Sequence, residues 1–298
     1  MNEFTIFLQR ILWGEMHKKT VLTITITALF LSGFLAGCSD DSEEKSRQVR
    51  ADQEALEVSK AESAKTTDYV LAINWQPAFC ESSPRKRACK TQKKGRYDTT
   101  HFSLHGLWPQ PGTNVYCDVP KEQVSLDKQG QWRQLRVEQI NDYVWRDLQQ
   151  IMPGTMSGLH KHEWVKHGTC YSLSIDDYYS HSVWLVRRIN ASKLQDLFES
   201  RIGLEVTSDE IKAAFSQSFG PAAGERLRIS CRRDPDSNRT LISEITVGLS
   251  GKINGEKSFA DLVNAASAVT AGCPRGIVDP VGLQNLENLQ NIQKPDKK

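Results

Sequence analysis

The sequence lacks a strong excess of charge of either sign. It carries 38 Lys and Arg against 36 Asp and Glu, a formal net charge of +2. From Asp68 onward the balance is 30 against 26, about +4. A balance this modest permits a polyanionic ligand but does not require one. An internal repeat is also absent, so nothing in the sequence indicates a repeat architecture.

A long apolar run is missing as well. The run from Val21 to Phe34 is too short to span a bilayer. Lys18 and Lys19 precede it and Leu35-Ala-Gly-Cys38 follows it, an order that predicts a secretory signal peptide over residues 1–37. Small residues directly before a cysteine resemble the lipobox of bacterial lipoproteins, which implies cleavage before Cys38 and acylation of its thiol. The alternative is an ordinary signal peptide that happens to contain a cysteine.

The start of the chain and its destination are expectations of the same kind. Met16 is a plausible start, and we assign no function to residues 1–15. The lipid at Cys38 would anchor an exported protein to the bacterial cell envelope, on its periplasmic face. Ser39, where many inner-membrane lipoproteins carry Asp, favours the outer membrane. We expect a monomer without an obligate protein partner.

Large apolar side chains are almost absent between Ser39 and Thr67. Such a segment cannot bury enough surface to offset the entropy lost on ordering. Residues 38–67 are therefore predicted to be the lipidated cysteine and a disordered tether. The alternative is a short solvated helix around Ala51 to Lys60.

Residues 68–298 are long enough for one globular domain. Alternating apolar residues predict strands over Tyr69–Trp75, Leu227–Cys231 and Leu241–Leu249. Helical spacing predicts helices over Trp132–Ile151, Ile175–Phe198 and, behind a capping box, Thr207–Phe219. Together these elements predict an α+β fold with a central antiparallel sheet and packed helices.

Five of the seven histidines lie in two short segments, 101–110 and 160–170. The first segment reads as a strand that ends at His105, beside a turn begun by Gly106. The second reads as a helix, on which Glu163 and His167 share a face. Crowded ionisable groups of this kind suit chemistry in which one group removes a proton and another donates one.

Metal binding is the alternative for such a cluster. The zinc-protease signature needs two histidines four residues apart. Here His162 and His167 are five apart, which places their rings about 140° from each other on a helix. Joint chelation from this helix is therefore disfavoured.

The two segments resemble the active-site motifs of the ribonuclease T2 family, endoribonucleases that cut RNA through a 2′,3′-cyclic phosphate. The matching residues are Phe102-Ser-Leu-His-Gly-Leu-Trp-Pro109 and His162-Glu-Trp-Val-Lys-His-Gly-Thr-Cys170. Both motifs match at nearly every position, in the family's order and spacing. The resemblance implies the family's α+β fold, RNA as the substrate, and catalysis without a cofactor or a metal.

The resemblance also implies a role for each matched residue. His167 is expected to be the general base and His105 the general acid. His162 would position the phosphate, with Lys166 and Glu163 supporting the transition state. Two further positions, Trp108 and Tyr116, match residues that stack on a base in the family. Gln110 departs from the acidic residue that several members carry there, and low base specificity is expected.

Six cysteines remain once Cys38 is set aside for lipid. Behind a signal peptide an even set indicates disulfides, although sequence alone allows 15 pairings of six cysteines. The resemblance implies three pairs, Cys80–Cys89, Cys117–Cys170 and Cys231–Cys273.

A basic run, Arg85 to Arg96, precedes the first motif and is either a solvated loop or a region that draws a polyanion toward the site. An inactive, tethered RNA-binding lipoprotein is one alternative function. A metal-dependent phosphodiesterase is the other.

Overall fold

The structure is a computed structural model that describes residues 41–63 and 65–282. The predicted signal peptide and Cys38 therefore lie outside the described residues. The segment predicted to be a disordered tether is helical over Asp41–Ser63 (α2). Glu, Lys, Gln and Ala are common in this helix and have high helix propensity. The residues of α2 whose burial is described, 44–57 and 60, are exposed. The solvated-helix alternative was thus closer than the coil, although the helix is longer than Ala51 to Lys60.

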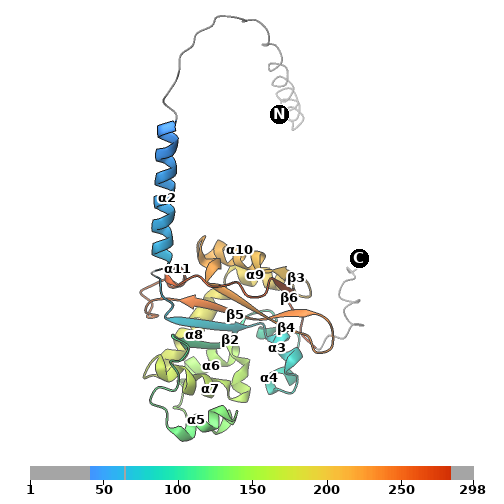
Figure 1. The fold of residues 1–298 in the computed structure, drawn as a ribbon. Coiled ribbons are helices and arrows are strands. Elements are labelled where there is room, and N and C mark those ends of the chain that lie inside the picture. The colour runs from blue at the N-terminus through green and yellow to red at the C-terminus, as the bar shows by residue number, and fades with distance from the viewer. Residues whose placement is uncertain (1–40, 64, 283–298) are drawn as a thin grey trace, which may run out of the picture. The chain divides into compact units, whose positions relative to one another are not determined.

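A six-stranded sheet lies at the centre of the remaining chain (Figure 1). Its order is β2-β1-β5-β6-β3, and β4 pairs with β5 away from this path. The strands are Tyr69–Asn74 (β1), Ser103–Pro109 (β2), Glu205–Thr207 (β3), Leu227–Arg233 (β4), Thr240–Leu249 (β5) and Arg275–Ile277 (β6). All pairs are antiparallel except β5 with β6, which is parallel. The predicted α+β fold with a largely antiparallel sheet is confirmed.

Helices pack around this sheet (Figure 1). They are Gln76–Ser82 (α3), Arg87–Lys90 (α4), Lys121–Lys128 (α5), Asp142–Ile151 (α6), Leu159–Lys166 (α7), Ile175–Ile189 (α8), Lys193–Ser200 (α9), Ser208–Phe219 (α10) and Phe259–Ala265 (α11). The capping box at Thr207 opens α10 as predicted. The long helix predicted from Trp132 was wrong in its first half. Asn141 caps the backbone N–H of Tyr143, so that α6 begins only at Asp142.

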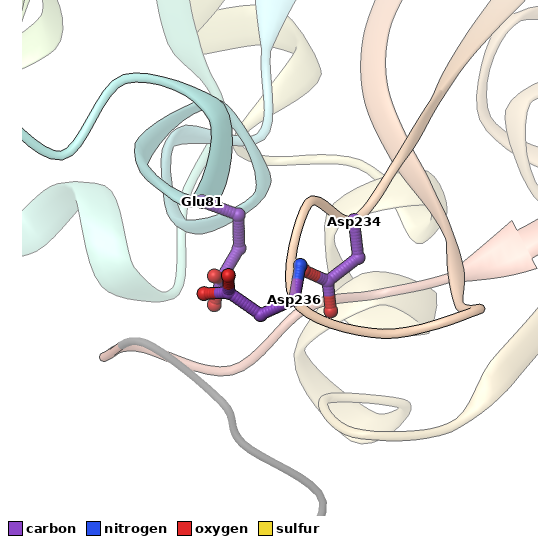
Figure 2. Close-up of side chains that lie close together, drawn as sticks. All are labelled: Glu81, Asp234 and Asp236. Atoms are coloured by element: carbon purple, nitrogen blue, oxygen red, sulfur yellow. The ribbon is translucent and has the colours of Figure 1, made fainter.

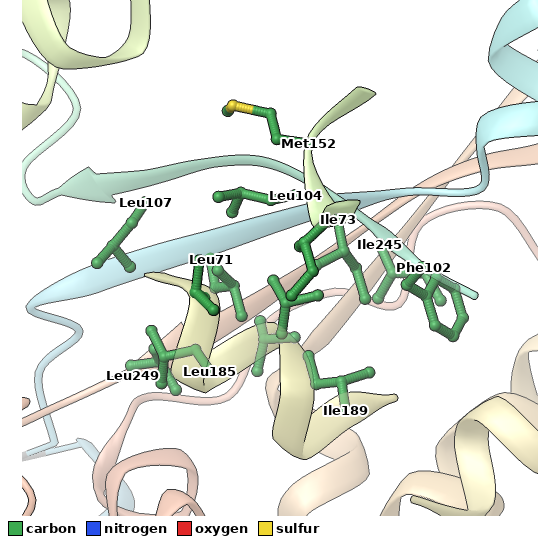
Figure 3. Packing of buried hydrophobic residues seen from close by; sticks show 14 of the residues in the cluster. Leu71, Ile73, Phe102, Leu104, Leu107, Met152, Leu185, Ile189, Ile245 and Leu249 are labelled. Atoms are coloured by element: carbon green, nitrogen blue, oxygen red, sulfur yellow. The ribbon is translucent and has the colours of Figure 1, made fainter. Parts of the chain in front are cut away.

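The hydrophobic core fills one face of the sheet. Leu71 and Ile73 of β1 pair with Val247 and Ile245 of β5, and all four are buried. Figure 3 shows Leu185 and Ile189 of α8 packed among these side chains. Because side chains alternate along a strand, the intervening residues Val70, Asn74, Trp108 and Glu244 point to the opposite face.

The three predicted disulfides are present: Cys80–Cys89, Cys117–Cys170 and Cys231–Cys273. The second joins the loop after β2 to the end of the second motif, across a sequence separation of 53 residues. Closing a loop of this size stabilises the fold by about 4 kcal/mol in the chain-entropy model. None of the helices among the described residues is both long and apolar enough to cross a membrane.

Candidate active site

A β-bulge in β2 presents His105. Ala72 of β1 pairs with Gly106, whereas its neighbour Ile73 pairs with Leu104, which leaves His105 as the extra residue. A bulge re-aims the side chain it carries. The strand therefore does not end at His105, as the sequence suggested, but continues through Gly106 to Pro109.

Two carboxylates hold the His105 ring. Its Nδ1 lies 2.6 Å from Oε2 of Glu244, a residue of β5, which is separated from β2 by β1 in the sheet. Its Nε2 lies 3.6 Å from Glu163 Oε1, on α7. Burial lowers the pKa of His105, but the hydrogen bond to Glu244 and the negative charges of Glu163 and Glu244 outweigh burial and leave the pKa raised. The imidazolium form is thus favoured.

Glu163 is the centre of the cluster. Its carboxylate is buried, and Oε2 accepts a hydrogen bond of 2.9 Å from Trp108 Nε1. Burial raises the pKa of Glu163. The positive charges of His105 and His162 lower this pKa, but the effect of burial is larger. A Cβ placed on Gly106 would lie 2.0 Å from Glu163 Oε2. Only glycine at this position allows the carboxylate to lie directly against β2.

His162 is held from three sides. Its Nδ1 lies 2.6 Å from Asp127 Oδ1, and its Nε2 lies 3.7 Å from Glu163 Oε1. The ring of Trp132 stacks on it, with centroids 4.5 Å apart. The other oxygen of Asp127 accepts a 2.8 Å hydrogen bond from the Tyr116 hydroxyl. Asp127 thus joins His162 of the second motif to Tyr116 in the loop after β2.

His167 ends the helix that carries Glu163. Its backbone N–H donates to the Glu163 carbonyl at 2.9 Å, which completes the last turn of α7 (Leu159–Lys166). The imidazole is buried, and its Nδ1 forms no hydrogen bond within the described part of the chain. Burial, together with the positive charges of Lys166, His162 and His105, lowers the pKa of His167 to about 3. The ring is therefore neutral at ordinary pH.

Lys166 and Tyr116 complete the set predicted from the sequence. Among the described residues, no carboxylate forms an ion pair with Lys166, yet its charge lowers the pKa of His167. The Tyr116 backbone N–H donates to the Lys166 carbonyl at 2.9 Å. The structure thus brings together all seven predicted residues. Two histidines outside the matched positions lie apart: His101 stacks on Tyr97, and His160 lies against Trp145.

Sequence reasoning missed three neighbours of the cluster, which are Glu244, Asp127 and Trp132. Glu244 carried a weak signal, because it is a charged residue within the otherwise apolar run of β5. Asp127 lies in a polar segment and carried none. Trp132 was expected to lie on a helix and to face the hydrophobic core. It lies instead in a 3-10 turn and is only partly buried.

A separate acidic cluster bears on metal binding. Glu81, Asp234 and Asp236 place one carboxylate oxygen each within 4.8 Å of the others, and Figure 2 shows the three side chains converging. Arg239 compensates part of this charge, since its guanidinium lies 2.6 Å from Asp234 and 2.9 Å from Asp279. None of these residues belongs to the histidine cluster.

Comparison with known proteins identifies the family. Residues 66–264 match the sequence model of the Ribonuclease T2 family. Over 244 residues the chain is 23% identical to ribonuclease I of Escherichia coli K12, covering 70% of this chain and 80% of that protein. Over 178 residues it is 24% identical to ribonuclease 3 of Arabidopsis thaliana, covering 58% and 74%. The solved structure of ribonuclease MC1 from bitter gourd seeds is similar at 19% identity and a TM-score of 0.40, covering 71% and 99%. The chain carrying this histidine cluster therefore belongs to the ribonuclease T2 family and is an RNA-cleaving enzyme.

Proposed function

We propose that this enzyme cleaves single-stranded RNA by acid–base transphosphorylation, through a 2′,3′-cyclic phosphate and with low base specificity. The observation that carries the proposal is the placement of two histidines in one cluster, where the rings of His105 and His167 lie 5.3 Å and 5.6 Å from the Trp108 ring between centroids. Their surroundings shift the two pKa values in opposite directions. The pKa of His167 is lowered to about 3, whereas the pKa of His105 is raised. A neutral imidazole accepts a proton and an imidazolium donates one, so the two rings are prepared for different roles.

The reaction needs one proton removed and one supplied. His167 takes the proton of the ribose 2′-hydroxyl, whose oxygen then attacks the adjacent phosphorus. As the bond from phosphorus to the 5′-oxygen breaks, His105 donates its proton to that leaving oxygen. The products are a 2′,3′-cyclic phosphate and a free 5′-hydroxyl, and atoms and charge balance without a metal.

Negative charge grows on the phosphoryl oxygens in the transition state, and cations there lower its free energy. Lys166 supplies a fixed cation that no described carboxylate neutralises. His162, oriented by Asp127 and Glu163, offers a second donor. Glu163 holds His105 and His162 in place through its Oε1, which lies within 3.7 Å of both rings.

The low base specificity rests on the aromatic residues beside the cluster. The Trp108 N–H is bonded to Glu163 and the Tyr116 hydroxyl to Asp127. Their polar atoms are thus engaged within the protein, and their rings offer stacking, which tolerates any base. The Gln110 side-chain amide donates a hydrogen bond to the Trp108 carbonyl at 3.1 Å. This amide is thus also engaged within the protein and is not directed at a particular base.

Product analysis tests the proposal. The purified protein, with disulfides oxidised, is incubated with a defined RNA in EDTA beside a His167→Ala variant. We expect fragments that end in 2′,3′-cyclic phosphate from the wild type and about 10³-fold fewer from the variant. Cleavage that appears only after metal is added would favour a metal-dependent phosphodiesterase. No cleavage under either condition would favour an inactive RNA-binding protein.

The pH profile of kcat/KM should be a broad bell with separable limbs. Activity needs His167 neutral, so it rises through the lowered pKa of about 3. It also needs His105 protonated, so it falls above the ordinary histidine pKa near 6.5 because the pKa of His105 is raised. Glu244→Gln removes a charge that raises the pKa of His105. The alkaline limb should therefore move to lower pH, while the acid limb stays in place.

Stopped assays from pH 2.5 to 9 on a short oligonucleotide measure both limbs. Glu256→Gln is the matched control, since Glu256 is an exposed carboxylate in the loop after β5. Equal profiles for Glu244→Gln and the wild type would contradict the role of Glu244 as the positioning residue of His105.

A further inference from the structure

A basic hollow adjoins the active site. One hollow of about 360 Å³ opens beside His105 and Glu244. A second, of about 400 Å³, shares Lys86, Trp132 and Ser157 with the first. The second hollow is lined by four basic residues, Arg85, Lys86, Arg87 and Arg133, which we call the basic shelf. Among the described residues that line this hollow, none carries a carboxylate.

The cations of the basic shelf are available to a ligand. All four side chains are exposed, and none forms an ion pair with a carboxylate in the part of the chain that the structure describes. Two of the four are partly engaged: the Arg133 guanidinium donates to the Met156 carbonyl at 3.2 Å, and the Lys86 ammonium lies over the Trp132 ring. Some other surface arginines are paired with a carboxylate, for example Arg187 with Asp147 at 2.6 Å.

Neighbouring acids do not cancel this charge. Arg85 and Lys86 also line an adjoining hollow to which Glu81 and Asp236 contribute. Glu81 is buried and lies 3.8 Å from Arg239, so part of its charge is already compensated. The basic shelf therefore remains net positive.

The fold connects the basic shelf to the catalytic cluster. The Cys80–Cys89 disulfide closes the loop that carries Arg85, Lys86 and Arg87. Lys86 Nζ lies 5.2 Å from the centre of the Trp132 ring. The same ring stacks on His162 at 4.5 Å. Trp132 thus lies against both His162 of the cluster and Lys86 of the shelf, so a chain that passes from the reacting phosphate over Trp132 reaches the shelf.

We propose that the basic shelf binds the phosphates of RNA nucleotides beyond the cleaved linkage. This inference rests on the proposed function and adds to it a substrate class, oligonucleotides rather than dinucleotides. Guanidinium groups suit phosphate oxygens because they donate two parallel hydrogen bonds. An anionic membrane would also attract these charges, but Lys86 of the shelf lines the same hollow as His105, which favours the substrate of that site.

A length series of RNA tests the inference. We compare the cleavage of a dinucleotide with that of a hexanucleotide. The hexanucleotide has one scissile linkage, because all its other 2′-hydroxyls are replaced by hydrogen. The shelf variant is Arg85→Gln/Arg87→Gln/Arg133→Gln. Its control is Arg228→Gln/Lys252→Gln/Lys257→Gln, which removes the same charge from three exposed positions. Lys252 and Lys257 follow Leu249, the last residue of β5, whereas Glu244 lies in the middle of that strand.

For the shelf variant we expect kcat/KM on the hexanucleotide to fall by about tenfold at low salt, while the dinucleotide changes less than about twofold. The slope of log kcat/KM against log salt should fall by about 2 for the hexanucleotide, because three cations are removed. The control should match the wild type on both substrates.

Other outcomes separate the two proposals. If the wild type fails to release a cyclic phosphate from the dinucleotide, the proposed function fails first. If the dinucleotide is cut normally but shelf and control variants cut the hexanucleotide equally, the inference is overturned. It is also overturned if the shelf variant loses only binding to vesicles of phosphatidylglycerol.

Discussion

His105→Ala and His167→Ala should each lower kcat/KM for RNA by about 10³-fold, but a substrate with an activated leaving group should rescue only the first. His105 donates a proton to the leaving oxygen, and a leaving group that departs as a stable anion needs no such proton. His167 acts on the attacking 2′-hydroxyl, which is the same in both substrates. The raised pKa of His105 and the lowered pKa of His167 predict this division of labour.

A uridine 3′-(p-nitrophenyl) phosphate supplies the activated leaving group and a direct absorbance signal. His101→Ala is the matched control, because that ring stacks on Tyr97 and lies outside the cluster. Its activity should equal that of the wild type on both substrates. Rescue of His167→Ala instead of His105→Ala would reverse the two roles. Rescue of neither would mean that both histidines act on structure or binding.

Local spacing predicted the part of the cluster that lies on one helix, whereas the family resemblance supplied Trp108, Tyr116 and the role of each residue. Four of the groups lie within six residues, His162 to His167, and a helix brings such neighbours together without help from the rest of the chain. The antiparallel sheet and the capped helix α10 were also predictable, since alternation and a capping box are local patterns. The family resemblance supplied the disulfide pairing that spacing leaves open.

Tertiary partners could not be predicted in this way. Glu244 lies 139 residues from His105, and no local pattern records that they meet. The bulge at His105 depends on how β1 and β2 pair, so it appears only when both strands are in register. The helix expected from Trp132 failed for a similar reason. Leu135 and Ile140 are buried in the core, but they lie in the loop before α6, which begins only after Asn141.

Gly106→Ala should destabilise the fold by about 2 kcal/mol and lower kcat/KM by about 10²-fold or more. The new methyl would lie 2.0 Å from Glu163 Oε2 and 2.6 Å from Trp108 Nε1, closer than any real contact. Glu163 is buried and cannot swing into solvent. Either the carboxylate shifts and releases His105 and His162, or β2 moves away from α7. Thermal unfolding and RNA cleavage measure the two effects.

Gly248→Ala is a matched control on the same face of the sheet. Gly248 pairs with Val70 as Gly106 pairs with Ala72, but a Cβ there would meet its neighbours at 3.5 Å or more, an ordinary contact. Its stability should change by less than about 0.5 kcal/mol, with activity unchanged.

A double-mutant cycle identifies what Gly106 makes room for. In a Glu163→Ala background the carboxylate is gone, and Trp108 loses the acceptor that fixes its indole. Adding Gly106→Ala should then cost less than half of its effect in the wild type, because the two residues are in direct contact and their effects are not additive. An equal cost in both backgrounds would place the strain in the bulged backbone of β2. In that case Gly106 would be required by the backbone conformation of β2. The position of Glu163 between His105 and His162 would then follow from the bulge in β2, and the absence of a side chain at Gly106 would not be what makes room for Glu163.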